Sequence, residues 1–342
     1  MNGVQPQTGS RSETPHLRPS QFFHPLATSE EVTSTPQRFT LLNTDIVAFR
    51  DTEGRPIAFK DVCIHRGTPL SLGWLDGDNL VCAYHGWAYD RTGRCVRIPA
   101  LPEGRGIPGK ARAIRYEIGE AYGVVWVAID EPVAPIPSFP NGEWDKPGWR
   151  GFLSVVETWH SSAGRILENF CDWAHLPWVH ENLLGTRDHS EVQPYNVWES
   201  DLQLGFTVEP DAALASGDLV GQARHVYTIS LPFTVHLTRE ECDSGHETLS
   251  SMSVAPLTPK LSKVYLWVTR NHTLAPEADE TFRDFDRTIL AQDRHIVERQ
   301  RPEEIPLDLR AEMHVKVPDA FSVLYRRLLS EFGEESDDFL HA

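Results

Sequence analysis

Cysteine is scarce in this sequence, and long hydrophobic runs are missing. The 342 residues contain five cysteines, an odd and scattered set that fits a reducing compartment better than a disulfide framework. The longest nearly apolar run, residues 122–129, is far shorter than the roughly 20 residues that a membrane-spanning helix needs. Residues 1–20 also lack the apolar core of a secretory signal. We therefore expect a cytoplasmic protein without a membrane partner, in which thiols are metal ligands or core residues.

Clusters of basic residues are missing as well. The chain has 32 Lys and Arg against 49 Asp and Glu, a formal net charge of −17, and no more than two basic residues are adjacent. Such a chain is a poor partner for nucleic acid or an anionic membrane, so we expect neither. No G-x-G-x-x-G segment follows a predicted strand and opens a helix. We therefore do not expect NAD(P)H to bind this chain directly.

The length and the distribution of prolines predict two domains. One domain per roughly 150 residues is a common ratio, and residues 131–140 contain four prolines, which favours an extended linker. Short β-favouring runs alternate with turn signals before this linker. After it, strand candidates alternate with helical stretches near 164–184, 276–300 and 318–332, which predicts an α+β domain. The predicted parts are a mobile tail over 1–19, an all-β domain over 20–135 and a catalytic domain over 136–342.

Two cysteine-histidine pairs stand in the predicted all-β domain. Cys63-x-His65 is followed after sixteen residues by Cys82-x2-His85, and a glycine closely follows each histidine. A Rieske [2Fe–2S] cluster needs two thiolates on one iron and two imidazoles on the other. Two loops that each supply one cysteine and one histidine suit it. A Cys2His2 zinc site uses the same residue types, but it usually pairs Cys with Cys and His with His. Two plain buried thiols would not explain the repeated loop.

The second domain contains the segment ENFCDWAHLPWVH, with two candidate ligands for a mononuclear metal. A non-haem Fe(II) oxygenase uses two imidazoles and one carboxylate and leaves other positions open. His175 and His180 are five residues apart, so they would diverge by about 140° on a straight helix. We expect Pro177 to break the helix between them and let the rings converge. The alternative is a solvated acidic turn with incidental histidines.

Two acids precede His175 in this segment. Glu168 and Asp172 lie seven and three residues before it, and we expect all three residues to share a helix face. One of these acids can then orient the histidine ligand.

The third ligand is expected from a later helical segment. Asp293 falls within an apolar stripe, and a carboxylate on a core-facing stripe needs a partner, which iron would provide. Asp286 lies at the edge of the same stripe and competes with it. The alternative is an acid paired with Arg283 or Arg294. The stripe is formed by Phe282, Phe285, Ile289 and Ile296.

Both constellations resemble those of the Rieske non-haem iron oxygenases. The matching residues are Cys63, His65, Arg66, Gly67, Cys82, Tyr84, His85, Gly86, Trp87, Glu168, Asn169, Asp172, His175 and His180. The resemblance implies an all-β Rieske domain followed by a helix-grip domain, in which an antiparallel sheet curls around a long helix. It favours Asp293 as the carboxylate ligand, because a Glu-x-Gln stretch follows at residues 298–300. It also implies a homotrimer in which Asp172 bridges His85 of one subunit to His175 of the next.

The function implied by this resemblance is that of a terminal oxygenase. A separate reductase, with or without a ferredoxin, would pass electrons from NAD(P)H to the [2Fe–2S] cluster. Fe(II) would then activate O2 and insert oxygen into a small aromatic or apolar substrate. The chain length resembles the class of hydroxylases and O- and N-demethylases, so we expect monooxygenation. The alternatives are cis-dihydroxylation of an aromatic ring and, in another class, an electron carrier without oxygenase activity.

Overall fold

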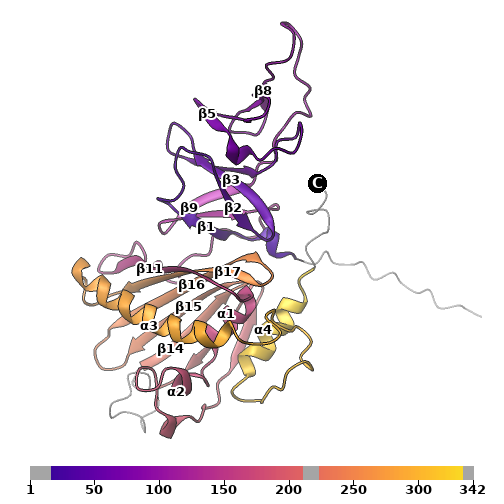
Figure 1. Ribbon diagram of the computed structural model, residues 1–342. Coiled ribbons are helices and arrows are strands. Elements are labelled where there is room, and N and C mark those ends of the chain that lie inside the picture. The colour runs from indigo at the N-terminus through magenta and orange to yellow at the C-terminus, as the bar shows by residue number, and fades with distance from the viewer. Residues whose placement is uncertain (1–16, 211–222, 334–342) are drawn as a thin grey trace, which may run out of the picture.

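The computed structural model describes residues 17–210 and 223–333, which form two β-rich parts (Figure 1). The predicted boundary at 135/136 falls between the last strand of the first part and the first strand of the second, in a stretch without helix or strand. Residues 1–16 of the predicted mobile tail lie outside the described residues. At the end of that tail, Arg18 pairs with Asp130 at 2.6 Å.

The first part is built of short strands, as the sequence predicts, with two single-turn 3-10 helices, η1 (Pro19–Gln21) and η2 (Leu70–Leu72). They form three antiparallel sheets in the orders β1-β10-β9, β2-β3-β4 and β5-β6-β7-β8. The bounds are β1 (His24–Thr28), β2 (Gln37–Leu41), β3 (Thr44–Arg50), β4 (Pro56–Lys60), β5 (Trp74–Asp76), β6 (Asn79–Val81), β7 (Ala88–Tyr89), β8 (Cys95–Arg97), β9 (Glu117–Ala121) and β10 (Val124–Ala128). Every residue of β10 is buried, because this strand shares a core both with the β2-β3-β4 sheet and with the sheet of the second part. Trp126 stacks on Trp267 with ring centroids 5.8 Å apart.

The second part contains a seven-stranded antiparallel sheet in the order β11-β17-β16-β15-β14-β13-β12. Burial alternates along β14 because successive side chains point to opposite faces of a strand. The bounds are β11 (Arg150–Trp159), β12 (Val197–Ser200), β13 (Gln203–Val208), β14 (Ala223–Ser230), β15 (Thr234–Glu241), β16 (Glu247–Thr258) and β17 (Leu261–Arg270).

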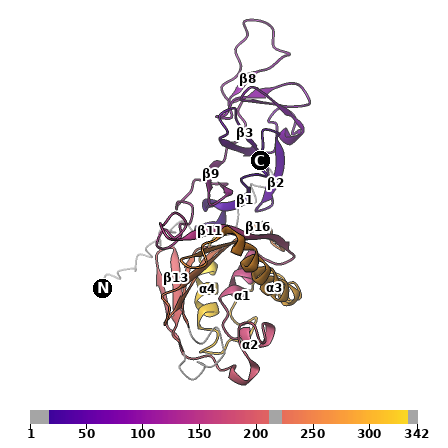
Figure 2. The same cartoon turned by 90° about the vertical axis from the view of Figure 1, so that its left-hand side faces the viewer.

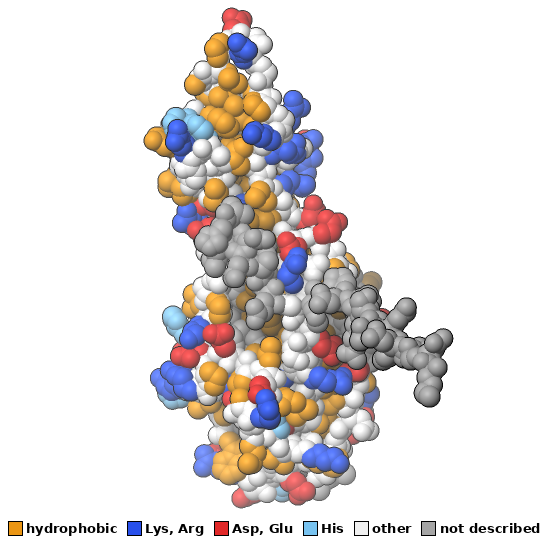
Figure 3. Space-filling view, turned by 90° about the vertical axis from the view of Figure 1, so that its right-hand side faces the viewer, with side chains coloured by type: hydrophobic (Ala, Val, Ile, Leu, Met, Phe, Trp, Pro, Cys, Tyr) orange, Lys and Arg blue, Asp and Glu red, His pale blue; other side chains and the backbone are white. Residues whose placement is uncertain are grey.

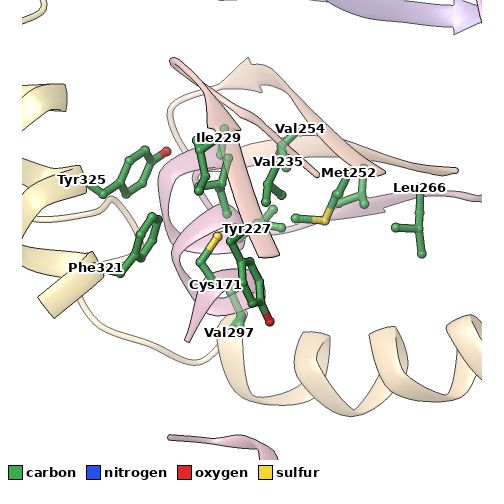
Figure 4. Packing of buried hydrophobic residues seen from close by; sticks show 14 of the residues in the cluster. Cys171, Tyr227, Ile229, Val235, Met252, Val254, Leu266, Val297, Phe321 and Tyr325 are labelled. Carbon is green, nitrogen blue, oxygen red and sulfur yellow. The ribbon is translucent and has the colours of Figure 1, made fainter. Parts of the chain in front are cut away.

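Helices cover one face of this sheet (Figures 1 and 2). The long helix α3 (Asp279–Val297) and helix α4 (Ala320–Ser330) lie in the segments where the sequence predicts helices. The other two helices are α1 (Ala163–Cys171) and α2 (Leu176–Val179). Aromatic and aliphatic side chains of the sheet and the helices meet in one core (Figure 4). The arrangement confirms the predicted α+β fold with an antiparallel sheet packed on a long helix.

The predicted apolar stripe on α3 is wrong in its details. Phe285 and Ile296 are 41% and 47% exposed, whereas Leu290, Asp293 and Val297 are buried. The face of α3 that meets the sheet is therefore rotated away from the most hydrophobic residues. Tertiary packing has overridden the apolar pattern, although Asp293 itself is buried as the stripe predicted.

Candidate metal centres

Both cysteine-histidine loops are closed by the same pair of backbone hydrogen bonds. In each loop the cysteine N–H donates to the carbonyl five residues later, at 2.8 Å from Cys63 and 2.9 Å from Cys82. The glycine four residues after the cysteine donates back to the cysteine carbonyl, at 2.8 and 3.0 Å. These glycines, Gly67 and Gly86, have φ of +70° and +68°, which L side chains rarely adopt. The repeated spacing therefore encodes two copies of one turn.

The four side chains form a thiol pair and an imidazole pair. Cys63 and Cys82 are buried in one apolar cluster, and the rings of His65 and His85 lie with centroids 4.5 Å apart. Nδ1 of His65 is buried without a hydrogen-bond partner among the described residues. Burial raises the pKa of the Cys63 thiol, so a thiolate there needs a positive partner. The set fits a Rieske cluster, which would supply that charge and bind the unpartnered imidazole nitrogen.

The helix break in the second domain lies before His175, not between the two histidines. Helix α1 ends at Cys171, and Asp172 is extended with φ −78° and ψ 123°. Pro177 stands in the first turn of α2, where its missing N–H costs nothing. His175 and His180 therefore flank a single helical turn. The expectation that Glu168, Asp172 and His175 share one helix face is wrong for the same reason.

The two histidines converge on the acid of α3. Nε2 of His175 and Nε2 of His180 lie 3.3 and 3.0 Å from Oδ1 of Asp293, and 3.3 Å from each other. Among residues 17–210 and 223–333, this is the one group of three or more His, Cys, Asp or Glu whose ligand atoms lie within 4.8 Å of one another. Asp286, the competing candidate, is not in this group.

Neighbouring side chains hold these three candidate ligands in place. Oε1 of Gln292 lies 2.7 Å from Nδ1 of His180, so Nδ1 carries the proton and Nε2 is free to bind a metal. Asn169 donates to Oδ1 of Asp293 at 3.4 Å. Oδ1 of Asp172 accepts the N–H of Ala174 at 2.9 Å, which leaves Oδ2 at 3.3 Å from Nδ1 of His175.

The electrostatics of the group suit a cation. Burial opposes a charged His175, but the carboxylates of Asp172 and Asp293 outweigh it and raise its pKa to about 9. Burial likewise opposes ionisation of Asp293. The imidazoles of His175 and His180 outweigh this effect of burial, so the pKa of Asp293 is lowered. Two imidazoles and one carboxylate that favour positive charge between them fit the ligand set of non-haem Fe(II).

Glu168 does not orient a metal ligand. Its carboxylate accepts two hydrogen bonds from the guanidinium of Arg326 on α4, at 2.6 and 2.7 Å, and both side chains are buried. Arg326 also pairs with Glu312 at 2.7 Å. The pair ties α1 to α4, so it supports the helix that precedes the histidines instead of the histidines themselves.

Replacing Arg326 by methionine should lower the free energy of unfolding by about 3–5 kcal/mol, because it removes both hydrogen bonds to the buried Glu168 carboxylate and leaves only Arg165 near it, at 3.9 Å. Urea unfolding measures the change. Adding Glu168→Gln should recover much of the loss, since the side chain that lost its partner is then uncharged and Arg165 keeps its pair with Glu312. The matched control is Arg310→Met, which removes an exposed arginine paired with Asp308. Equal losses in the two single variants would contradict the role of the buried pair.

Asp286 lies two helical turns before Asp293 and has another partner. Its Oδ2 accepts the hydroxyl of Ser154 on β11 at 2.5 Å. No cation lies within 4.0 Å of it among the described residues, and burial raises its pKa to about 6 despite the Ser154 hydrogen bond. The folded state therefore holds its proton more tightly than the unfolded chain, so its stabilising effect is present at low pH and is lost as the pH rises through 6.

Asp286→Asn should remove this pH dependence. Compared with the variant, the native protein should lose about 3 kcal/mol of unfolding free energy between about pH 4 and pH 7. Urea unfolding across this range measures the difference. Asp284→Asn, an exposed acid on the same helix, is the control and should follow the native curve. Parallel curves for all three proteins would show that Asp286 titrates normally.

Comparisons with known proteins identify the families of both domains. Residues 22–121 match the family model of the Rieske [2Fe-2S] domain, and residues 159–335 match that of the vanillate O-demethylase oxygenase C-terminal domain. Methylxanthine N1-demethylase NdmA of Pseudomonas putida is 29% identical over 94% of this chain and 91% of its own. Methylxanthine N3-demethylase NdmB of the same species is 27% identical over 91% of this chain and 89% of its own.

Solved structures show the same architecture. NdmA of Pseudomonas putida with caffeine superposes with a TM-score of 0.79 at 28% identity, over 90% of this chain and 89% of that one. Dicamba monooxygenase superposes with a TM-score of 0.74 at 20% identity, over 91% and 97%, and shows the shared fold. With both family models matched and both ligand groups assembled, the chain belongs to the Rieske-type oxygenases with a vanillate O-demethylase type of catalytic domain.

Proposed function

We propose that this protein is the terminal component of a monooxygenase that removes a methyl group from a small organic substrate. The observation that carries the proposal is the convergence of His175, His180 and Asp293 in a domain of the vanillate O-demethylase type. Iron held there would supply the site of O2 activation. The expected residues of the cluster site are Cys63, His65, Cys82 and His85.

The overall reaction balances with two external electrons. One oxygen atom enters the methyl group, which then leaves as formaldehyde, and the other oxygen atom is reduced to water with two electrons and two protons. The electrons would come from NAD(P)H through a separate reductase, because the cluster site has no neighbouring dinucleotide fingerprint. The two relatives named above that match this chain over most of its length are demethylases, which favours this reaction over ring dihydroxylation.

An electron carrier is the alternative from another class. A carrier needs no second metal, and a buried cluster of two imidazoles and a carboxylate would then be a cost without a use. Iron analysis separates the two functions, since a carrier should contain about two irons per chain and the oxygenase about three. Among the helices that the structure describes, none has the length and the apolar character needed to cross a membrane.

The test is O2 uptake with formaldehyde release. Purified protein, a generic NAD(P)H-dependent reductase and a panel of N-methylpurines and aryl methyl ethers should show formaldehyde formed in step with O2 consumed for at least one substrate. Purines enter the panel because two relatives are named methylxanthine demethylases. A cis-diol product without formaldehyde would establish the dihydroxylation alternative. A colourless protein with stoichiometric zinc would contradict both.

A further inference from the structure

The subdomain that carries the cluster ligands is positive in a strongly negative chain. Residues 62–116 contain eight basic and four acidic side chains, whereas the whole chain has a net charge of −17. Figure 3 shows Lys and Arg side chains gathered beside hydrophobic ones at this end of the molecule. The basic residues are Arg66, Arg91, Arg94, Arg97, Arg105, Lys110, Arg112 and Arg115.

Two of these arginines are held directly opposite each other. Arg94 and Arg112 form an antiparallel bridge, and the backbone hydrogen bonds of Cys95 (2.8 Å) and Ala113 (2.7 Å) lie on either side of it. In such a non-hydrogen-bonded pair the Cα atoms are about 4.5 Å apart and the side chains lie close together on one face. Like charges in this position are destabilising.

The fold does not compensate this repulsion. No carboxylate oxygen of a described residue lies within 4.0 Å of either guanidinium, and the Arg112 side chain donates to the carbonyl of Thr92 at 2.9 Å. Other arginines of the subdomain do have acids, as Arg97 pairs with Asp76 at 2.8 Å. The unpaired charges of Arg94 and Arg112 are therefore available to an external acidic group.

Exposed apolar side chains adjoin the two arginines. Val96 and Ile114 follow them at i+2, which places them on the same face, and they are 42% and 49% exposed. Lys110 is exposed at the corresponding position on the other side of the bridge. Branched aliphatic residues with a basic rim are typical of a protein contact surface, not of a solvated edge.

The opposite side of this surface packs on the thiol half of the cluster site. Cys95 lies between Arg94 and Val96 and points inward, into the apolar cluster that contains Cys63 and Cys82. A molecule on the outer face is thus separated from the cysteine ligands by one layer of side chains.

We propose that Arg94, Val96, Lys110, Arg112 and Ile114, the basic face, dock an acidic electron-donor protein that carries a [2Fe–2S] centre. The inference rests on the proposed function and deepens it by assigning the surface through which electrons enter. One electron passes from the reduced donor centre, which is oxidised, to the oxidised Rieske cluster, which is reduced; no bond or proton changes. Opposite charges on the two proteins speed their encounter and make it sensitive to salt.

The test uses the full-length holoprotein and a small acidic [2Fe–2S] ferredoxin as the probe. Calorimetry with oxidised ferredoxin measures binding, and stopped-flow absorbance with reduced ferredoxin measures reduction of the cluster. Arg94→Glu with Arg112→Glu should weaken binding and slow second-order reduction by at least about tenfold at low salt, and the difference should shrink at high salt. Arg94→Lys with Arg112→Lys should retain most of the binding affinity and most of the reduction rate, because the positive charges remain.

Two controls separate the possible outcomes. Arg299→Glu with Arg310→Glu makes the same change in net charge at exposed arginines of the other domain. This variant should keep both the binding affinity and the reduction rate near native. Reduction by dithionite, which needs no docking, should be unchanged in every variant.

Three results would overturn the proposal: native binding by the double glutamate variant, equal losses in the control, or a wild-type protein that does not bind the ferredoxin. A change of oligomeric state on size exclusion would show that a second copy of the chain occupies this face. A protein without a cluster would instead contradict the proposed function, while calorimetry would still report on docking.

Discussion

Replacing Asp293 by alanine should remove the mononuclear iron and reduce turnover at least about 100-fold, while the Rieske cluster stays intact. Oδ1 of Asp293 is the atom on which both histidine nitrogens converge, and it is the only carboxylate oxygen in the group of the described residues. Residues that merely support a ligand already cost about 10–100-fold when removed, so loss of the ligand itself should cost more. Iron should fall from about three to about two per chain, and the spectrum of the reduced cluster should not change.

Asp286→Ala is the matched control for this variant. Asp286 is a carboxyl on the same helix, two turns earlier, and its partner is Ser154. The Asp286 variant should retain the third iron. If the Asp293 variant kept its third iron and its activity, the assignment of the carboxylate ligand would be wrong, and Asp286 would be the next candidate.

Asp172→Asn should leave both metal sites loaded and slow electron transfer between them by about 10–100-fold. The carboxylate of Asp172 is fixed by the N–H of Ala174 and faces Nδ1 of His175 at 3.3 Å. Asparagine keeps the size of the side chain but loses the charge that favours a proton on His175. In the trimer that the resemblance implies, the same carboxylate would bridge to His85 of a neighbouring subunit.

The arrangement of one chain supports transfer between subunits. The strands of the cluster subdomain and helix α2 lie at opposite ends of the molecule in both ribbon views (Figures 1 and 2). Stopped-flow reoxidation of the reduced protein, with substrate and O2, measures the step. Asp188→Asn, an exposed acid after α2, is the control. Reoxidation of the Asp172 variant at the native rate would remove it from the pathway, and a fully active monomer would rule out the bridge.

The cluster loops could be predicted because their geometry is local. Each loop needs a cysteine, a histidine and a glycine within five residues, and the hydrogen bonds that close it join residues four or five apart. The long helix α3 was predictable for a similar reason, since helical hydrogen bonds join neighbours along the chain. Its buried face was not, because Phe285 and Ile296 give a stronger apolar signal than the residues that meet the sheet.

The sequence by itself determined which residue types carry the chemistry: two Cys-His loops, and a His-His-Asp set of which Asp293 was one of two candidates. Only the tertiary structure places Asp293, and not Asp286, beside the two histidines, because the sheet fixes which turn of α3 faces them. It also decided the partners of the charged residues. Gln292 contacts His180 across 112 positions, Ser154 contacts Asp286 across 132 and Arg326 contacts Glu168 across 158. No spacing rule reaches that far, since such contacts depend on how sheet and helices pack and not on the neighbours of either residue.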